Sequence, residues 1–407
     1  MSDELLQRIQ RLQFTDKQQA ERLLLEFLGE SFGIAIRAVE LRPLAVSLNS
    51  FNGFLKLEDG GRLFFKTHVE PDTAIDEYYN AQQLADAGYP ILQPIYRSGE
   101  VGRQILIYPA VDDPSVFDAA WAIETGQRDD LDALAQKQHD ADDLLRIIYE
   151  RTLAWQSAAE SAKAPIHQLF YHRLTGGRLA RFYADEIEVA LPDGRASMGE
   201  IKRVRWVING IPYADSLNAI IANAAARLNP ARAAPSVIGH GDAHNGNVFF
   251  RPDGLMYFDP AFAGRHAVLL DLAKPLFHNV FAMWMYFPNE MRSRLRIALH
   301  RQGDLWHVDY DYPLHPVRVM FFESKVERVL RPILRELQRR GWLDADWRDT
   351  LRAALFCCPF LTMNLADAFK FPPEIRLLGL SMAVEMGSGC ENGAGSPLLA
   401  RALRADG

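Results

Sequence analysis

The pattern of hydrophobic positions changes from helical to strand-like within the first part of the chain. Over residues 3–28, hydrophobic side chains recur at helical spacing, at Leu5, Ile9, Leu12, Leu23, Leu24 and Phe27. This spacing predicts an amphipathic helix whose apolar face packs on the body of the protein. Short apolar runs follow at residues 45–48, 54–57 and 62–66, and the Glu-Asp-Gly-Gly turn between the last two predicts a hairpin.

The later pattern is mostly helical. Residues 74–87 predict a helix ending at Gly88, and residues 104–108 predict a short strand. Residues 112–143 are rich in Asp and Gln and are expected to be partly loop, whereas 144–160 predict a helix. Residues 191–210 read as an insertion of undetermined shape. Further helices are expected at 268–303, 316–340 and 346–368. A β-rich part followed by an α-rich part indicates an α+β protein with two lobes.

Composition narrows the class of protein. The chain has 407 residues, enough for two lobes, with 48% hydrophobic and 24% charged residues, as in ordered globular proteins. The net charge of −7 argues against a nucleic-acid partner. No apolar stretch is long enough for a membrane helix, and the N-terminus lacks the apolar core of a signal peptide. Cys357, Cys358 and Cys390 show no zinc-binding spacing. We therefore expect a cytoplasmic protein without membrane contact.

The strongest chemical signal lies in residues 237–260, VIGHGDAHNGNVFFRPDGLMYFDP. An apolar segment leads to Asp242, Asn247 opens a strand, and a second strand ends at Asp259. A hairpin of this kind brings the three polar side chains to one edge. Phosphoryl transfer needs a carboxylate beside the acceptor hydroxyl, and oxygen ligands for magnesium. Oxygen-only ligands suit Mg²⁺ better than zinc.

This segment resembles a known superfamily. HGDAHNGN is similar to the HxDxxxxN catalytic loop of the aminoglycoside phosphotransferase and choline kinase superfamily, and FDPAFAGRHAVLLDLA is similar to its DPxxxxG…DLA segment. The resemblance implies a bilobal protein-kinase-like fold with a small antiparallel-sheet N-lobe carrying one helix and a large, mainly helical C-lobe. It also implies roles for five residues: Asp242 as catalytic base, Asn247 and Asp259 as magnesium ligands, His240 as a scaffold of the loop, and Asp271 as a carboxylate tying the next helix to the loop.

The N-terminal part contains the lysine that such kinases need. Lys66 closes the strand of residues 62–66, and Glu77 lies on the next helix. A strand lysine paired with a helix glutamate holds ATP phosphates in kinases. We expect this ion pair here, although an exposed lysine and a solvated glutamate would also fit the pattern.

The phosphate-covering loop is expected at residues 47–53 (SLNSFNG). No GxGxxG motif is present, so backbone amides with Ser50 or Asn52 would have to bind the phosphates. Residues 106–111 would form the hinge that meets adenine, although an edge strand and a turn explain them equally well.

These features predict domain boundaries and partners. Residues 1–35 would form a helical extension, 36–111 the nucleotide-binding N-lobe, and 112–407 the C-lobe with the catalytic hairpin. The substrates would be Mg·ATP and a small molecule with a hydroxyl group, bound by a monomer or homodimer.

Three other functions fit the sequence less well. A protein Ser/Thr kinase is disfavoured by the missing arginine before Asp242, the missing Gly-rich loop and the short segment after Asp259. A catalytically inactive pseudokinase, acting as a nucleotide-binding interaction module, would be expected to have lost at least one of the key residues. A metallo-hydrolase using Asp242 and His244 would need further ligand motifs, and we find none.

The type of acceptor is constrained by charge. Residues 1–229 contain 24 Lys and Arg against 33 Asp and Glu, whereas residues 230–407 contain 21 against 19. Polycationic antibiotics favour an acidic cleft, which the nearly neutral second part would not supply. The segment from Asp259 to Phe277 also resembles fructosamine kinases. A sugar derivative or an amino alcohol is therefore the expected acceptor. Trp284, Tyr286 and Phe287 could line its pocket, although such a cluster is more often core.

Overall fold

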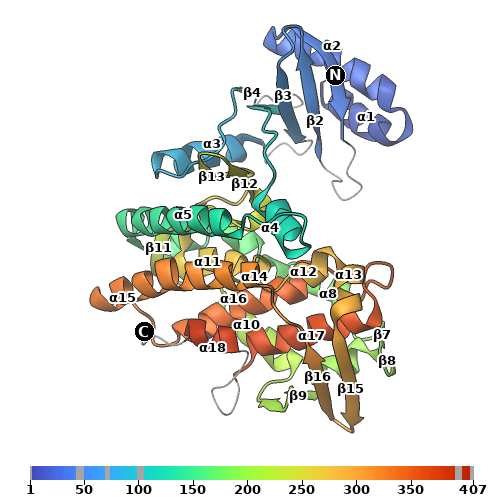
Figure 1. The fold of residues 1–407 in the computed structure, drawn as a ribbon, viewed down its shortest axis with the longest axis vertical. Helices are drawn as coiled ribbons and strands as arrows, with labels where there is room; N and C mark the ends of the chain where they lie inside the picture. Colours follow the sequence, from blue (N-terminus) through green and yellow to red (C-terminus); the bar gives the residue numbers. More distant parts are fainter. Residues whose placement is uncertain (1, 43–49, 69–73, 99–104, 390–396, 404–407) are drawn as a thin grey trace. The chain divides into compact units, whose positions relative to one another are not determined.

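A computed structural model describes residues 2–42, 50–68, 74–98, 105–389 and 397–403 (Figure 1). The chain divides into two compact units. The first comprises Met1–Pro114 with Met256–Ala261, and the second comprises Ser115–Leu255 with Phe262–Gly407. The chain thus returns briefly to the first unit at the end of the predicted catalytic hairpin. Both helices and sheets are abundant, in agreement with the predicted α+β class.

The first unit is built on one antiparallel sheet with the strand order β1-β2-β3-β5-β4. The predicted hairpin at residues 58–61 is confirmed, because it joins β2 to β3. The run at 45–48 lies outside the described residues. The strands are β1 (Ile36–Leu41), β2 (Ser50–Leu57), β3 (Arg62–His68), β4 (Tyr96–Ser98) and β5 (Ile105–Pro109).

Three helices accompany this sheet: α1 (Ser2–Thr15), α2 (Lys17–Phe32) and α3 (Ala74–Asp86). The single helix predicted for residues 3–28 is two helices, because the Asp16 side chain caps α2 by accepting a hydrogen bond from Gln19 N (3.0 Å). The apolar faces of α1 and α2 are buried with the sheet in one core, as predicted, where Leu24 and Phe65 are fully buried.

The second unit is mainly helical. Among the described residues, its longest helices are α5, α16 and α17, and α11, α16 and α17 are almost entirely buried. The helical segments are α4 (Val116–Glu124), α5 (Leu131–Thr152), α6 (Ala158–Ser161), η1 (Pro165–Gln168), α7 (Tyr171–Thr175), α8 (Arg178–Tyr183), α9 (Met198–Arg203), α10 (Leu217–Arg227), η2 (Asn245–Asn247), α11 (Val268–His278), α12 (Met283–Tyr286), α13 (Pro288–Arg294), α14 (Pro316–Lys325), η3 (Val326–Leu330), α15 (Arg331–Arg339), α16 (Trp347–Leu361), α17 (Pro373–Gly387) and α18 (Pro397–Leu403).

Small sheets complete the second unit. The three-stranded sheet has the order β14-β11-β6, the four-stranded sheet has the order β10-β9-β16-β15, and β7-β8 and β12-β13 are hairpins. Their strands are β6 (Ala154–Gln156), β7 (Glu188–Leu191), β8 (Gly194–Ser197), β9 (Arg205–Ile208), β10 (Ile211–Tyr213), β11 (Ala234–Gly239), β12 (Val248–Arg251), β13 (Gly254–Tyr257), β14 (Gly264–Ala267), β15 (Arg296–Gln302) and β16 (Leu305–Asp311).

Two helix predictions from the pattern are wrong in part. Residues 112–143 are partly loop, as expected, and they also contain α4 and the first part of α5, where the buried Asp142 accepts hydrogen bonds from Ser324 and Lys325. The helix predicted at 144–160 ends with α5 at Thr152, because β6 follows and pairs with β11. The helix predicted at 268–303 ends before β15, which pairs with β16; β16 in turn pairs in parallel with β9. That distant pairing favours strands over a helix.

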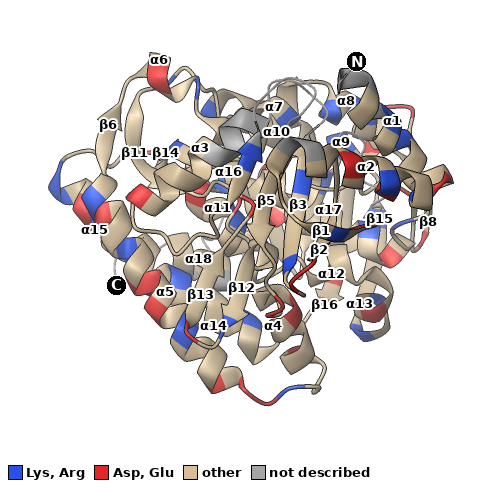
Figure 2. Cartoon of the chain, turned by 90° about the horizontal axis from the view of Figure 1, so that it is seen from above, with Lys and Arg blue, Asp and Glu red and all other residues tan. Residues whose placement is uncertain are grey.

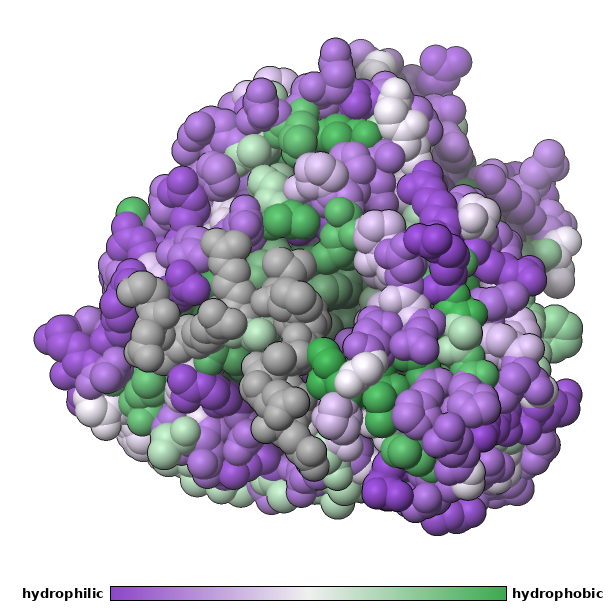
Figure 3. Space-filling view, turned by 60° about the horizontal axis from the view of Figure 1, so that its bottom comes forward, coloured by the Kyte–Doolittle hydropathy of each residue, from purple (hydrophilic) through white to green (hydrophobic). Residues whose placement is uncertain are grey.

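The surface is chemically mixed. Lys and Arg alternate with Asp and Glu along α5 and α15 in Figure 2. In Figure 3, hydrophilic residues cover most of the visible face, and hydrophobic residues gather in patches between them. Within the described part of the chain, none of the helices has the length and apolar character needed to cross a membrane.

Candidate active site

Lys66 lies on the middle strand of the first unit's sheet and contacts a carboxylate from a distant part of the sequence. It stands on β3 between Asn52 on β2 and Leu106 on β5. Its Nζ is 2.8 Å from Asp259 Oδ1, and the two side chains are 20% and 42% exposed. Folding therefore brings together two residues that the sequence predicted as parts of one site.

The segment that carries Asp259 is held by hydrogen bonds within the first unit. Tyr257 N donates to Pro90 O (2.7 Å), Leu92 N donates to Tyr257 O (2.8 Å), and Asn80 Nδ2 donates to Pro260 O (3.2 Å). Asp259 itself has a φ of +55°, a left-handed conformation that Asp adopts more readily than most residues. These contacts fix the carboxylate at the end of the hairpin.

The other residues predicted in this unit are only partly described. Asn52 lies within β2, directly opposite Lys66, and not in a loop. The first part of the predicted phosphate loop, residues 43–49, lies outside the described residues, as do the side chains of Ser50 and Glu77. The predicted phosphate contacts and the Lys66–Glu77 ion pair therefore remain predictions.

In the second unit, β11 leads into the predicted catalytic loop. His240 follows the strand and is fully buried. Gly241 has a φ of +79°, and a Cβ there would lie 2.3 Å from Phe262 O, so only glycine fits. Gly241 N donates to Asp271 Oδ1 (2.6 Å), and Tyr149 donates to the other oxygen of the same carboxylate. The expected tie between Asp271 and the loop is thus present.

The loop brings Asp242 and Asn247 together. Asn247 Nδ2 donates to the backbone oxygen of Asp242 (3.0 Å), and His244 N donates to the same oxygen (2.8 Å). Asn245 N donates to Asn279 Oδ1 (2.8 Å), which anchors the loop to the end of α11. Two of the three residues predicted at the edge of the hairpin are therefore neighbours.

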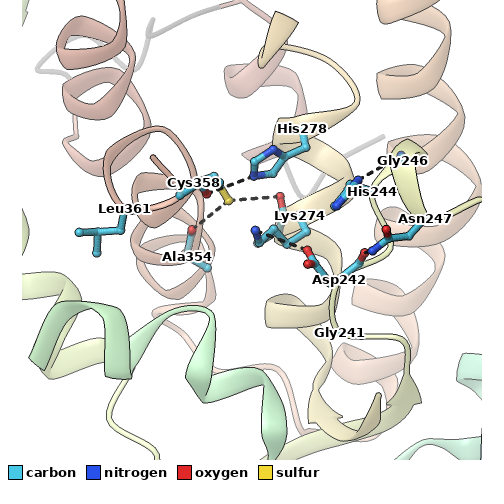
Figure 4. Close-up of polar contacts among 12 residues, drawn as sticks. Gly241, Asp242, His244, Gly246, Asn247, Lys274, His278, Ala354, Cys358 and Leu361 are labelled. Carbon is cyan, nitrogen blue, oxygen red and sulfur yellow. Dashed lines mark hydrogen bonds and ion pairs between the residues drawn. The ribbon is translucent and has the colours of Figure 1, made fainter. Parts of the chain in front are cut away.

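The Asp242 carboxylate faces a buried lysine (Figure 4). Lys274 Nζ, on α11, is 3.4 Å from Asp242 Oδ1, and the two side chains are 4% and 17% exposed. Burial alone would raise the pKa of Asp242, but the charges of Lys274, His244, His240 and Arg173 outweigh burial and lower it. Asp242 is therefore ionised at neutral pH, as a proton acceptor must be.

A neutral histidine and a tyrosine continue the polar cluster. His278 Nδ1 lies 2.9 Å from the Tyr286 hydroxyl, and its Nε2 lies 3.4 Å from Thr362 Oγ1. Burial, and to a lesser extent the charge of Lys274, lower the pKa of His278 well below its usual value. Its imidazole is therefore uncharged at neutral pH.

The three aromatic residues considered for a substrate pocket have different environments. Trp284 is fully buried and donates to Met382 Sδ (3.1 Å), so it belongs to the core. Tyr286 contacts His278, and Phe287 stacks on Trp121 with ring centroids 4.0 Å apart. Tyr286 and Phe287 thus remain candidates for lining an acceptor site.

Asn247 in the second unit and Asp259 in the first unit each offer an oxygen atom that suits a magnesium ion. Because Asn247 uses Nδ2 to hold the loop, its amide oxygen is the atom left to bind a cation, and Asp259 offers a carboxylate. Both are hard oxygen ligands, and Mg²⁺ commonly takes few protein ligands together with phosphate oxygens. Among the described residues, there is no cluster of three or more His, Cys, Asp or Glu arranged to hold a metal, and the pair Asp242–His244 belongs to none.

Sequence reasoning missed two cations near the predicted base. Lys274 lies on a helix whose other residues are nearly all apolar, and a lone lysine in such a run was the available signal. Arg173, on the short helix α7, gave no signal in the sequence. Their positions beside Asp242 depend on the fold.

Comparisons with known proteins find similarity at the level of structure. No protein-family model matches the chain, and no curated protein matches it significantly. A spectinomycin phosphotransferase in complex with ADP and spectinomycin superposes with a TM-score of 0.41 and 15% identity, covering 90% of this chain and 97% of that one. A protein assigned as a fructosamine-3-kinase from Thermobifida fusca YX-ER1 gives 0.41 and 15%, covering 88% and 95%.

A third similar structure is a thermostable mutant of an aminoglycoside phosphotransferase, solved with ADP and hygromycin B. Its TM-score is 0.47 at 11% identity, covering 89% of this chain and 98% of that one. By their names, these three proteins are small-molecule phosphotransferases or kinases, the class of protein that residues 237–273 resemble in sequence.

Proposed function

We propose that this chain is a magnesium-dependent phosphotransferase that moves the γ-phosphate of ATP to a hydroxyl group of a small molecule. The observation that carries the proposal is the 2.8 Å contact between Lys66 Nζ and Asp259 Oδ1, which are far apart in sequence. For phosphoryl transfer, a nucleotide site needs a cation that binds the phosphates and, next to it, a carboxylate that binds magnesium.

Asp242 is proposed as the base. The acceptor hydroxyl would donate its hydrogen bond to the Asp242 carboxylate, which orients the oxygen for attack and takes its proton. The proposal is supported by the lowered pKa of Asp242 and by the hydrogen bonds that fix its backbone. A positioned carboxylate of this kind typically contributes about 10²- to 10⁴-fold to the rate.

Asn247 and Asp259 are proposed to hold the magnesium ion. When bound, it neutralises charge on the phosphate oxygens. Lys66 would bind the phosphates as a point charge, and its contact with Asp259 keeps it in place before the nucleotide arrives. His240 would act only as a buried scaffold of the loop.

A small acceptor is favoured over a protein. The segment between β13 and α11 is short and contains β14, which pairs with β11. This pairing uses the stretch in which a protein kinase would carry a long activation loop. A sugar derivative or an amino alcohol thus remains the proposed acceptor, within a bilobal kinase-like arrangement that we also propose.

The experiment is an ADP-release assay with Mg·ATP against sugars, sugar acids, amino sugars and amino alcohols. We expect acceptor-dependent turnover that disappears with a chelator and in Asp242→Asn. Asp253→Asn is the matched control, because Asp253 sits 72% exposed on the same hairpin. Turnover by Asp242→Asn at the control's rate would show that another group is the base. Mg·ATP binding without turnover on any acceptor would favour the pseudokinase.

A further inference from the structure

The second unit contains a cavity that none of the proposed roles uses. Its volume is about 230 Å³, and its lining comes from α4, α12, α13 and α14 and from the segments before α12 and α14. Apolar side chains make up one part of the lining, and a cluster of charged side chains makes up another. No residue of the lining is among those assigned above to ATP, magnesium or the base. The cavity is therefore a candidate site for a further ligand.

Arg318 is the buried cation of this cavity. Its side chain is 1% exposed, its Nε donates to Glu124 Oε2 (2.8 Å), and its Nη1 donates to Asn279 O (3.5 Å). Its Nη2 is also buried but has no hydrogen-bond partner within the described part of the chain. Buried polar atoms are nearly always hydrogen-bonded, because an unpaired donor has lost its contact with water. The unpaired Nη2 therefore indicates an acceptor group that comes from outside the chain.

The charges of the lining do not cancel. Glu124 is the one carboxylate among the described residues of the lining, and its side chain is 8% exposed. It faces two cations, Arg318 and Arg294. The Nη1 of Arg294 is 3.9 Å from Glu124 Oε1, and this arginine is 50% exposed. One positive charge thus remains, and an excess of buried charge favours the binding of an anion.

The other titratable residues of the lining leave this excess unchanged. His315 is neutral at neutral pH, because its Nδ1 accepts a hydrogen bond from Val317 N (3.2 Å) and burial lowers its pKa. Tyr312 is neutral because burial raises its pKa, and its hydroxyl donates to Phe281 O (3.3 Å). The excess charge is therefore a property of the Arg318, Arg294 and Glu124 cluster.

The rest of the lining suits an apolar group. Val280, Met283 and Met291 are buried there, and Leu314 is half-buried. Methionine side chains adapt to irregular shapes and make favourable contacts with aromatic rings. At about 230 Å³, the cavity is smaller than the roughly 300–1,000 Å³ of drug-sized sites. It therefore suits a molecule with one ring or a short chain beside its charged group.

We propose that this cavity binds a small organic anion. Its carboxylate or phosphate group is held by Arg318 and Arg294, and its apolar part packs on Met283. A guanidinium binds either anion through parallel hydrogen bonds, and Arg318 Nη2 supplies donors that the described chain leaves unused. Such an anion has two sources, the acceptor of the proposed reaction and a separate ligand. Binding in the cavity does not itself rest on the proposed function.

The first test compares probes that share one ring, namely benzoate, phenyl phosphate, benzyl alcohol and benzylamine, with inorganic phosphate as the anion alone. Their effect on the Tm is measured in Lys66→Met, so that the nucleotide lysine does not contribute. We expect benzoate or phenyl phosphate to raise the Tm saturably. The half-saturation concentration should be at least about tenfold lower than for benzyl alcohol and for inorganic phosphate. The tighter of the two ring anions decides between carboxylate and phosphate.

Two results would overturn the proposal. The first is a half-saturation concentration for benzyl alcohol, benzylamine or inorganic phosphate that equals or undercuts that of the tighter ring anion. The second is the absence of a saturable shift with both ring anions.

Single variants, made in the Lys66→Met protein, locate the site. Glu124→Gln removes the carboxylate that competes with the ligand and should lower the half-saturation concentration about fivefold. Arg294→Gln should raise it about fivefold. Arg292→Gln is the matched control, because Arg292 lies on the same helix, is 53% exposed and is paired with Glu374 (2.9 Å). Weaker binding by Glu124→Gln, or equal effects of the two arginine variants, would contradict the assignment.

Arg318 is tested without leaving a buried carboxylate unpaired. The double variant Glu124→Gln/Arg318→Gln replaces both members of the buried pair with neutral side chains, and the saturable shift should be lost. A cooperatively folded double variant that binds the ring anion as tightly as its Lys66→Met parent would sink the proposal. If the double variant does not fold, the opposite effects expected for Glu124→Gln and Arg294→Gln still decide.

ADP release separates the two sources of the anion. With Mg·ATP and the otherwise unaltered protein, turnover of 4-hydroxymethylbenzoate that exceeds turnover of benzyl alcohol and is lost in Arg294→Gln would assign the anion to the acceptor. Saturable binding of 4-hydroxymethylbenzoate without turnover would assign it to a separate ligand. Absence of ADP release with every acceptor would count against the kinase proposal alone, because the Tm measurement does not depend on turnover.

Discussion

Each compact unit contains a lysine–aspartate pair that involves a predicted site residue, and these two pairs differ in exposure and distance. Lys66 and Asp259 are 2.8 Å apart and 20% and 42% exposed. Lys274 and Asp242 are 3.4 Å apart and 4% and 17% exposed. An exposed pair adds little to stability and exchanges partners readily, whereas a buried pair fixes the charge of its members. The first pair is suited to receiving a ligand and the second to maintaining an ionised base.

The largest effect should come from breaking the exposed pair. Asp259→Asn and Lys66→Met should each lower kcat/KM for ATP about 10²- to 10³-fold, because each removes a charge assigned to the phosphates. Steady-state kinetics with varied ATP and magnesium measure this. Glu40 and Lys56 form another exposed pair in this sheet, 3.4 Å apart, and Lys56→Met is the control. An equal loss of kcat/KM for ATP in Lys56→Met would show that Lys66 has no special role in binding the nucleotide.

Breaking the buried pair should mainly affect stability. Lys274→Met leaves the Asp242 carboxylate buried without its partner, which costs about 3 kcal/mol at neutral pH. Urea unfolding measures the difference in the free energy of unfolding. The Lys66→Met variant supplies the comparison.

The Lys274→Met variant should also change how activity and stability depend on pH. The folded-state pKa of Asp242 is lowered, so its charged form stabilises the wild type above the unfolded pKa, and this contribution is lost as the pH falls through the folded value. In Lys274→Met, burial should dominate and raise that pKa, moving the acid limb of kcat/KM to higher pH. The stability gap between wild type and variant should shrink as the pH falls from the raised pKa of Asp242 in the variant to its lowered pKa in the wild type. A gap independent of pH would contradict the ion pair.

A smaller loss of stability is expected from a substitution in the loop that follows β11 in the second unit. Gly241→Ala should cost about 2 kcal/mol or more, because the added methyl group meets Phe262 O in a left-handed backbone. Gly126 has a similar φ of +72° with open space around it, so Gly126→Ala measures the backbone strain alone. Equal losses in the two variants, measured by urea unfolding, would show that the loop yields to the added methyl group.

The smallest effect is the loss of stability on breaking the exposed pair. Lys66→Met should change the free energy of unfolding by less than about 1 kcal/mol, since water replaces the lost contact. The same unfolding experiment as for Lys274→Met measures it. A loss as large as that of Lys274→Met would erase the distinction between the two pairs.

The sequence predicted what depends on local pattern. The β2–β3 hairpin, α3 and the Lys66 strand follow from turns and periodicity, and the Asp242–Asn247 loop follows from a motif whose residues are close in sequence. What it missed depends on distant partners. The β15–β16 hairpin is fixed by pairing with β9, and the Asp- and Gln-rich part of α5 is helical because Ser324 and Lys325 satisfy Asp142.

The two cations beside the base illustrate the same limit. Lys274 is brought to Asp242 by the packing of α11 beside β11. Arg173, on a helix of five residues without any motif, acts on Asp242 through its charge. No periodicity or spacing in the sequence encodes these placements.

The most direct test of the central claim separates nucleotide binding from chemistry in one variant. Single-turnover transfer from γ-labelled ATP and the Kd of Mg·ATP would be measured for the wild type and Asp242→Asn. We expect phosphoryl transfer to fall about 10³-fold or more in Asp242→Asn, while the Kd of Mg·ATP stays within about threefold. Transfer at the wild-type rate by Asp242→Asn, or a Kd that rises in step with the loss of transfer, would contradict it.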